Sequence, residues 1–329
     1  MKYEKVLLDI KSTLSMPPEQ ALETLILCAK KGHSMASARA VQAIANVNHP
    51  EVVPSLIALY DWLEADPVKR DRSCDIRIAI VEVLGEIGSL HTIDTLRKAV
   101  RTVQIVKLGP TPEDIAIALR GTAALSLAKV DSNALYELAL LLFDEDPAVS
   151  TSEINRPFVK APVRKAAAQA IGILGDQGGI PILAVKLKFP NGEVPDVLAE
   201  CMESLIAMRP PYVMEVAKPY LGGDDEYLSA ITALALAENL GVDVLEPLLE
   251  TLDYVQGETK EAIVIAISVI RGSNIRRILF DFLDSQNPFV RRGAVKGIKS
   301  YMDDAVKEKL QIMRDTDPDK IVRQEAALD

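Results

Sequence analysis

The sequence predicts an all-α fold, a right-handed α-solenoid (superhelix) of stacked antiparallel helix pairs. Three observations predict it. A unit of about 31 residues recurs along much of the chain. Hydrophobic residues make up 49% of the sequence but aromatic residues only 5%, which favours closely stacked helices. No segment alternates apolar and polar residues as a half-buried strand would.

The repeat is clearest after residue 190, where four successive helices are predicted from DVLAECMESLIAMR, YLSAITALALAENL, ETKEAIVIAISVIR and FVRRGAVKGIKSYM. The tenth position of each copy is aliphatic, and successive copies are 31 residues apart. Eight copies share this register, with Ile44, Leu84, Leu127, Ile171, Leu205, Leu236, Ile267 and Ile298 at the tenth position. A ninth copy begins at KIVRQEAALD and stops short of its tenth position, so we expect this C-terminal unit either to fray or to pair with a second molecule as a homodimer.

Small or β-branched residues recur at two other positions of the unit. The sixth position holds Ala40, Ile80, Ala123, Ala167, Cys201, Thr232, Ile263 and Ala294, and the ninth holds Ala43, Val83, Ser126, Ala170, Ser204, Ala235, Ala266 and Gly297. Residues three apart share a helix face, so these positions let a neighbouring helix approach closely.

The segments between these helices predict a partner helix for each. They include HTIDTLRKAV, NALYELALLLF, VDVLEPLLETL and NIRRILFDFLD. Thr111-Pro112-Glu113-Asp114 is typical of a helix start, with an N-cap, a proline and acid in the first turn. Gly88, Gly175 and Gly241 stand where helices are expected to end.

The units differ in length along the chain. Tenth positions are 40, 43, 44 and 34 residues apart before the spacing settles at 31. We therefore expect one solenoid over residues 1–329, with longer units carrying inserted loops in 30–175 and regular 31-residue units in 176–329. The extra residues fall between the first and second helix of three units, at Ala65–Ser73, Val106–Pro112 and Ala148–Ala161.

Equivalent loops of successive units lie along one edge of a solenoid, where such arrays often bind partners. The predicted binding residues of this edge are Lys69, Arg70, Arg72, Lys107, Arg156, Phe158 and Lys160. Cations around an aromatic anchor suit an acidic peptide, a phosphorylated segment or an acidic protein face. The alternative is that surface loops tolerate insertion and stay polar.

The helix sequences resemble a known repeat family. Runs of V/I/L-R-x-x-A-x-x-x-L/I-G/A occur at Leu119-Arg120 and Val163-Arg164 and, with Ile80 in place of the alanine, at Ile76-Arg77, and LGEIG and IGILGD close two of them. They resemble the HEAT repeat, and more closely the bacterial HEAT-like repeats named after phycobilisome lyase subunits. The resemblance implies that the third-position arginines tie each helix to its neighbour; they are Arg77, Arg120, Arg164 and Arg291.

A second candidate surface is a basic stripe formed by Arg292, Lys296 and Lys299. These residues are spaced i, i+4, i+7 on a second helix, which lines the concave surface in HEAT-like arrays. Such a stripe suits an acidic partner or a nucleic-acid backbone. The alternative is a solvated helix face.

Composition excludes several function classes. The net charge of −10 argues against nucleic acid as the main partner. The three cysteines lack metal-like or redox-like spacing, and the three histidines stand alone. No His-Glu pair occurs, which counts against the di-iron hydroxylases built from HEAT-like repeats. The N-terminus does not resemble a signal peptide, and the longest apolar run, Ala262 to Ile270, is too short to span a bilayer.

These observations predict a non-enzymatic, cytoplasmic scaffold or adaptor that binds another protein through its concave surface and its edge of inserted loops. We expect no cofactor, metal or membrane contact, and a partner with an acidic or phosphorylated segment. One alternative is a chromophore-lyase-like accessory subunit that acts on an antenna protein. The other is a HEAT-like DNA-binding or repair protein, which the net charge disfavours.

Overall fold

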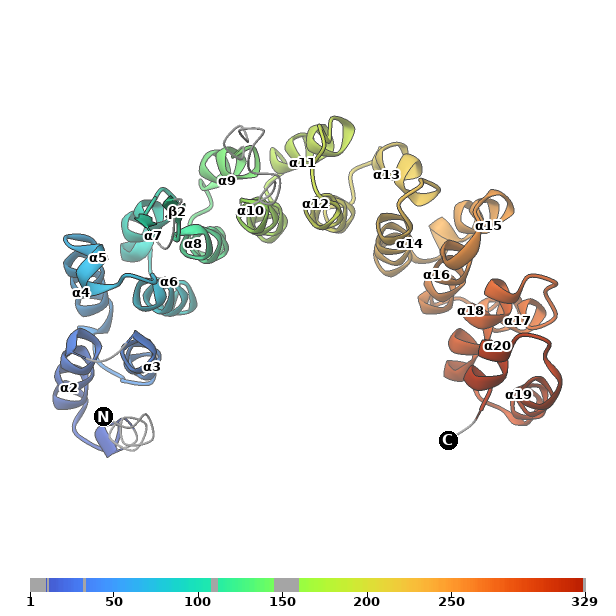
Figure 1. The fold of residues 1–329 in the computed structure, drawn as a ribbon, viewed down its shortest axis with the longest axis horizontal. Coiled ribbons are helices and arrows are strands. Elements are labelled where there is room, and N and C mark those ends of the chain that lie inside the picture. The colour runs from blue at the N-terminus through green and yellow to red at the C-terminus, as the bar shows by residue number, and fades with distance from the viewer. Residues whose placement is uncertain (1–9, 11, 32–33, 108–111, 145–159, 328–329) are drawn as a thin grey trace. The chain divides into compact units, whose positions relative to one another are not determined.

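The computed structural model describes residues 10, 12–31, 34–107, 112–144 and 160–327. The chain divides into two compact units, Met1–Ile182 and Leu183–Asp329. Both units consist almost entirely of helices in their described parts (Figure 1). The prediction of an all-α, HEAT-like array of helix pairs is therefore confirmed, while one continuous solenoid over the whole chain stays a prediction.

The N-terminal unit has two layers. The first layer holds α2 (Pro18–Lys31), α4 (Val52–Glu64), α7 (Ile93–Val100) and α9 (Leu135–Leu142), and the second holds α3 (Ser34–Ile44), α6 (Asp75–Ile87), α8 (Ile117–Val130) and α10 (Ala161–Leu174). Second-layer helices pack on one another in chain order, and each first-layer helix contacts the second layer. The connections hold α5 (Pro67–Arg70), η1 (Leu90–Thr92), β1 (Ile105–Lys107) and β2 (Pro112–Asp114).

The C-terminal unit repeats this plan. Its second layer is α12 (Pro195–Ala207), α14 (Glu226–Leu240), α16 (Gly257–Val269), α18 (Pro288–Ile298) and α20 (Lys320–Glu325). The helices packed against this layer are α13 (Val213–Leu221), α15 (Leu245–Tyr254), α17 (Ile275–Phe282) and α19 (Asp304–Thr316). The short helices η2 (Gly241–Val244) and η3 (Lys299–Tyr301) follow α14 and α18, and α11 (Gly179–Lys188) spans the division between the units.

The repeat register predicted the core. All eight tenth-position residues are 0% exposed, and the sixth-position and ninth-position residues are buried as well. Second-layer helices approach closely where these small residues lie. A Cβ added to Gly293 of α18 would lie 2.7 Å from the Cβ of Val264 in α16, closer than real side chains come. Gly293 is therefore required by the contact between these helices.

One short hairpin interrupts the helical pattern. Strands β1 and β2 pair antiparallel, with Ile105 opposite Asp114. The helix start predicted at residues 111–114 is wrong, because Pro112–Asp114 is a strand and α8 begins only at Ile117. The Asp114 carboxylate accepts hydrogen bonds from the N–H groups of Gln104 (3.1 Å) and Ala116 (3.0 Å), so it closes the hairpin and does not cap a helix at residue 111.

One stretch of the described residues, Glu226–Tyr254, is long and apolar enough to cross a membrane by length and composition alone. It comprises α14, η2 and α15 rather than one straight helix, and the break lies at Gly241, whose φ is 60°. Leu236 and Leu248 of this stretch are fully buried in the unit. Buried core helices have the same length and composition, so the stretch is weak support for a membrane span.

Candidate functional site

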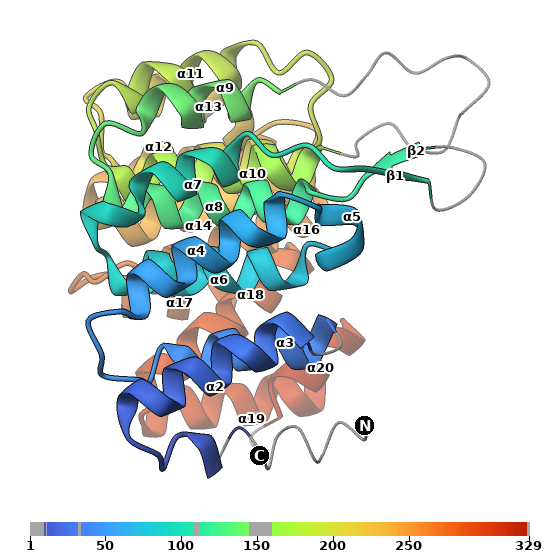
Figure 2. The same ribbon diagram turned by 90° about the vertical axis from the view of Figure 1, so that its left-hand side faces the viewer.

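The described parts of the first two inserted loops lie at the same end of the helices of the N-terminal unit (Figure 2). Helix α5 and the β1–β2 hairpin both extend from the same side of the unit (Figure 2). We call residues 65–73 and 103–107, with 112–114, the inserted edge. The third insertion lies largely outside the described residues, and so do two predicted binding residues, Arg156 and Phe158.

A buried hydrogen-bond network joins the first two insertions. Arg77 of α6 donates from Nε to Asp71 Oδ2 (3.0 Å) and from Nη2 to Gln104 Oε1, and its side chain is 1% exposed. Gln104 in turn donates from Nε2 to the carbonyls of Asp71 (3.3 Å) and Arg72 (3.0 Å). The loop after α5 is thus bonded to the residue that precedes β1, which fixes the two parts of the edge relative to each other.

A second ion pair fixes the hairpin on α8. Arg120 donates from Nη1 to Asp114 Oδ2 (2.6 Å) and to the carbonyl of Thr102 (2.9 Å). Both ends of the hairpin are therefore bonded to one buried guanidinium. The inserted edge is held by buried groups on two helices rather than by surface contacts.

Cys74 belongs to the same network and has a structural role. Its φ of 65° is left-handed, and its thiol lies 3.2 Å from Arg77 Nη2 and 3.6 Å from Gln104 Oε1. Burial raises the pKa of this thiol to about 11, so it stays protonated at neutral pH. Cys201 is also fully buried, with its pKa raised to about 12 by burial, which fits a packed thiol.

Two of the predicted binding cations make contacts within the chain. Arg70 lies over the Trp62 ring at 4.4 Å from the ring centroid and donates to the Trp62 carbonyl, so it holds α5 against α4. Lys160 forms an ion pair with Asp144 at 2.6 Å. Arg70 therefore braces the inserted edge, whereas Lys160 bonds to a residue just beyond the end of α9.

The other predicted cations of the edge point to solvent. Lys69 is 82% exposed in its side chain and, within the described ranges, meets only Asp66 of its own turn, at 3.5 Å. Arg72 and Lys107 are exposed, and their side chains form no ion pair or hydrogen bond among the described residues. Apolar side chains are exposed beside them, namely Val68, Val103 and Ile105. The edge therefore presents cations and apolar groups together.

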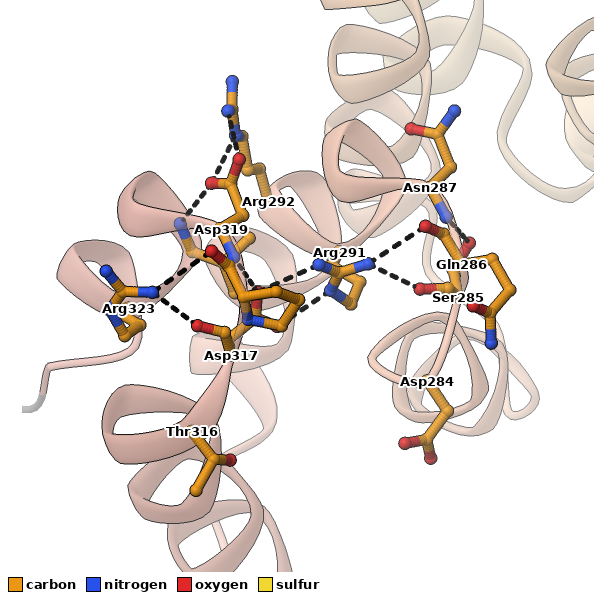
Figure 3. Close-up of polar contacts among 12 residues, drawn as sticks. Asp284, Ser285, Gln286, Asn287, Arg291, Arg292, Thr316, Asp317, Asp319 and Arg323 are labelled. Carbon is orange, nitrogen blue, oxygen red and sulfur yellow. Dashed lines mark hydrogen bonds and ion pairs between the residues drawn. The ribbon is translucent and has the colours of Figure 1, made fainter.

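The basic stripe of the C-terminal unit is paired within the chain. Arg292 donates to both carboxylate oxygens of Asp319, at 2.7 and 3.2 Å, and this lowers the pKa of Asp319 to about 2 (Figure 3). Lys296 donates to Glu261 Oε1 at 2.8 Å, and this hydrogen bond to the carboxylate raises the pKa of Lys296. Lys299 lies 3.4 Å from the carbonyl of Ala327. These contacts join α18 to α16 and α20.

The third-position arginines have the structural role that the repeat resemblance implied. Arg291 donates to both oxygens of Asp317 (2.8 and 2.9 Å) and to the Ser285 carbonyl (2.8 Å), and Arg323 donates to the Asp317 carbonyl (2.6 Å; Figure 3). Arg164 donates to the Asp144 carbonyl at 3.1 Å.

The aspartates of this arrangement were not predicted as site residues. Four of the arginines bind the residue six positions before them, through its carbonyl or its carboxylate; the pairs are Asp71–Arg77, Asp114–Arg120, Ser285–Arg291 and Asp317–Arg323. A recurring aspartate six residues before arginine is visible in the sequence, and would have located the capping groups. No such signal existed for Gln104.

Metal binding receives no support from the part of the chain that the structure describes. No three His, Cys, Asp or Glu side chains gather there in a way that could hold a metal ion.

Comparison with known proteins supports a HEAT-repeat family. Residues 245–328 match the family of HEAT repeats. No curated protein is similar enough to the chain to count as a match. The sequence runs that suggested a closer relation to the phycobilisome-lyase type find no counterpart in these matches.

A solved structure of human deoxyhypusine hydroxylase in complex with glycerol is similar over 95% of this chain and 95% of its own, with 16% identity and a TM-score of 0.28. The prediction that the chain is not an enzyme is contradicted by this match, because the matching protein is a hydroxylase. A lack of clustered catalytic residues in a helical-repeat sequence was too weak a ground for that prediction. At this TM-score the likeness gives no argument for hydroxylase activity here.

Proposed function

We propose that the chain is a protein-binding scaffold whose inserted edge holds an acidic segment of another protein. The observation that carries the proposal is the contrast between two basic surfaces. Lys69, Arg72 and Lys107 extend into solvent on the inserted edge, whereas Arg292 and Lys296 of the stripe already bind carboxylates of their own chain.

The exposed apolar groups of the edge support a protein partner over a small anion. Val68, Val103 and Ile105 offer apolar contact beside the cations, and affinity at protein interfaces comes largely from such contacts surrounded by polar groups. The buried network of Asp71, Arg77 and Gln104 supports the same proposal, because a preorganised edge loses less entropy when a partner binds.

The basic stripe is a poorer candidate for a binding surface. A partner that used Arg292 would have to displace Asp319, and one that used Lys296 would have to displace Glu261. The same argument weakens the alternative of a DNA-binding protein, which needs cations available to phosphates. The likeness to lyase-type repeats rests on the sequence runs alone and stays a prediction.

Charge reversal tests the proposal. The edge variant is Lys69→Glu, Arg72→Glu and Lys107→Glu, which leaves the Trp62–Arg70 contact in place. The matched control is Lys31→Glu, Lys129→Glu and Lys188→Glu, three exposed lysines outside the inserted edge, with the same change in net charge.

Each protein is immobilised and exposed to lysate of the source organism, and captured proteins are identified by mass spectrometry. The proposal predicts a protein that wild type and the control variant capture and the edge variant loses. Equal capture by all three would refute a role for the edge.

A further inference from the structure

We propose that the acidic segment binds as an extended strand added to the outer edge of β1, an inference that rests on the proposed function. The pairing of the hairpin shows which backbone groups are available. The Ile115 N–H donates to the Gln104 carbonyl at 3.0 Å, and Val106 lies opposite Glu113. In an antiparallel ladder, the residues between such bonded pairs direct their N–H and C=O groups away from the partner strand.

Ile105 and Lys107 are the two residues of β1 whose N–H and C=O groups point away from β2. Among the described residues, their backbone N–H and C=O groups make no hydrogen bond. They stand two residues apart on one strand edge, which is the spacing at which an added strand forms its ladder. The outer edge of β1 is therefore an open template for strand addition.

The opposite edge of the hairpin is unsuited to the same partner. Strand β2 begins with Pro112, which has no N–H to donate, and continues with Glu113 and Asp114. An acidic strand would meet like charge there. Strand addition by an acidic segment is thus directed to β1.

The side chains of β1 fit a partner strand in which apolar and acidic residues take turns along one face. Val103 is 63% exposed and Ile105 56% exposed, and Lys107 continues the same face. Gln104 and Val106 face the other way and are buried. Side chains of an added strand would lie beside this exposed face, with apolar groups against Ile105 and a carboxylate near Lys107.

The first insertion adds charge at the start of the strand. Gln104 Nε2 donates to the Arg72 carbonyl, so the backbone of Arg72 lies beside the residue that precedes β1. The Arg72 side chain is exposed to solvent beside the start of β1. An acidic segment along β1 would therefore meet a cation near each end of the strand.

Proline substitution separates backbone pairing from side-chain attraction. Ile105→Pro removes one outward N–H but no bond between β1 and β2, because that N–H points away from β2. Ile105→Thr keeps the N–H and is the matched control. The probe is an octapeptide that repeats Val-Thr-Glu-Thr, so that valine and glutamate alternate along one face of the strand, and its Val-Thr-Lys-Thr counterpart tests the charge requirement.

Two measurements are made on the full chain: peptide affinity by fluorescence anisotropy, and amide hydrogen exchange of β1 by NMR. Saturating acidic peptide is expected to slow exchange at Ile105 and Lys107 by at least about tenfold. Loss of one hydrogen bond is expected to weaken binding of Ile105→Pro by about three- to tenfold relative to Ile105→Thr. Unchanged protection of the Val106 amide in the free proline variant verifies that its hairpin is intact.

Three results would overturn the inference. They are unchanged exchange at Ile105 and Lys107 with acidic peptide, equal affinities of the proline and threonine variants, and equal binding of the lysine peptide. If rising protein concentration alone protects Ile105, a second copy occupies β1 and the acidic partner is refuted. If charge reversal of the edge abolishes capture of the cellular partner while Ile105→Pro retains it, the proposed function stands and strand addition fails.

Discussion

Replacing Arg77 by methionine is expected to lower the stability of the N-terminal unit by about 3 to 5 kcal/mol, the usual cost of removing one member of a buried ion pair. Asp71 is 0% exposed in its side chain and would lose its charged partner at 3.0 Å. Gln104 Oε1 would lose the N–H that it accepts. Asp71 would still accept from the backbone N–H groups of Ile76 and of residue 77, both at 3.1 Å, so we expect the lower end of the range.

Urea unfolding followed by circular dichroism measures this cost, with hydrogen exchange of β1 as a local readout. The matched control is Arg39→Met, which removes an exposed arginine that, in the part of the chain that the structure describes, bonds only to Gln42 of its own helix, and it should cost less than about 0.5 kcal/mol. In the Asp71→Asn background, Arg77→Met should cost at least about 1 kcal/mol less than in wild type. A loss below about 1 kcal/mol for Arg77→Met alone would refute the view that this pair supports the edge.

Gly293→Ala is expected to destabilise the C-terminal unit by about 1 to 3 kcal/mol in thermal unfolding, because its Cβ would overlap Val264 at 2.7 Å; no loss would show that α16 and α18 can move apart. Asp319 has a pKa of about 2 in the folded chain against 3.8 unfolded, so its pair with Arg292 stabilises fully above about pH 4 and loses that contribution as pH falls through 2. The pair contributes at most about 2.5 kcal/mol to the free energy of unfolding. Asp319→Asn should remove this part of its pH dependence in urea titrations at pH 2 to 7. Cys74, a buried thiol with a pKa of about 11, should react with a thiol reagent at pH 8 only as fast as its unit opens. Labelling is read at Cys74 by peptide mass spectrometry, because Cys28 is less buried, and rapid labelling of Cys74 in the folded chain would contradict its burial.

The sequence predicted the core because the core is periodic. Ile44, Leu127 and Ile298 lie far apart in the chain but occupy one position of the unit, and all are fully buried. Insertions break the period, so the sequence also predicts where the regular unit is interrupted, and α5 and the β1–β2 hairpin lie in two of those places. The packing of each helix on the next follows from the same register.

Contacts that do not repeat were beyond prediction. The spacing of Arg292 and Lys296 indicated a shared helix face, but their partners Asp319 and Glu261 lie on neighbouring helices, 27 and 35 residues away. The β1–β2 hairpin is too short for its alternation to show, and Pro112 followed by acids imitates a helix start. Nothing in the sequence singled out Gln104, since a lone glutamine indicates neither loop nor core.

The bond that Arg77, Arg120, Arg291 and Arg323 make to the residue six positions earlier has a consequence for how the connections of such chains can change in length. The guanidinium fixes the last residues before a second-layer helix, whatever precedes them. A connection can therefore lengthen upstream of that point without moving the helix. Connections of different structure can therefore precede the same kind of helix start. A short helix precedes α6, a hairpin precedes α8, and a turn precedes α18. Engineered loops grafted upstream of Asp71 or Asp114 should be accepted by the same means.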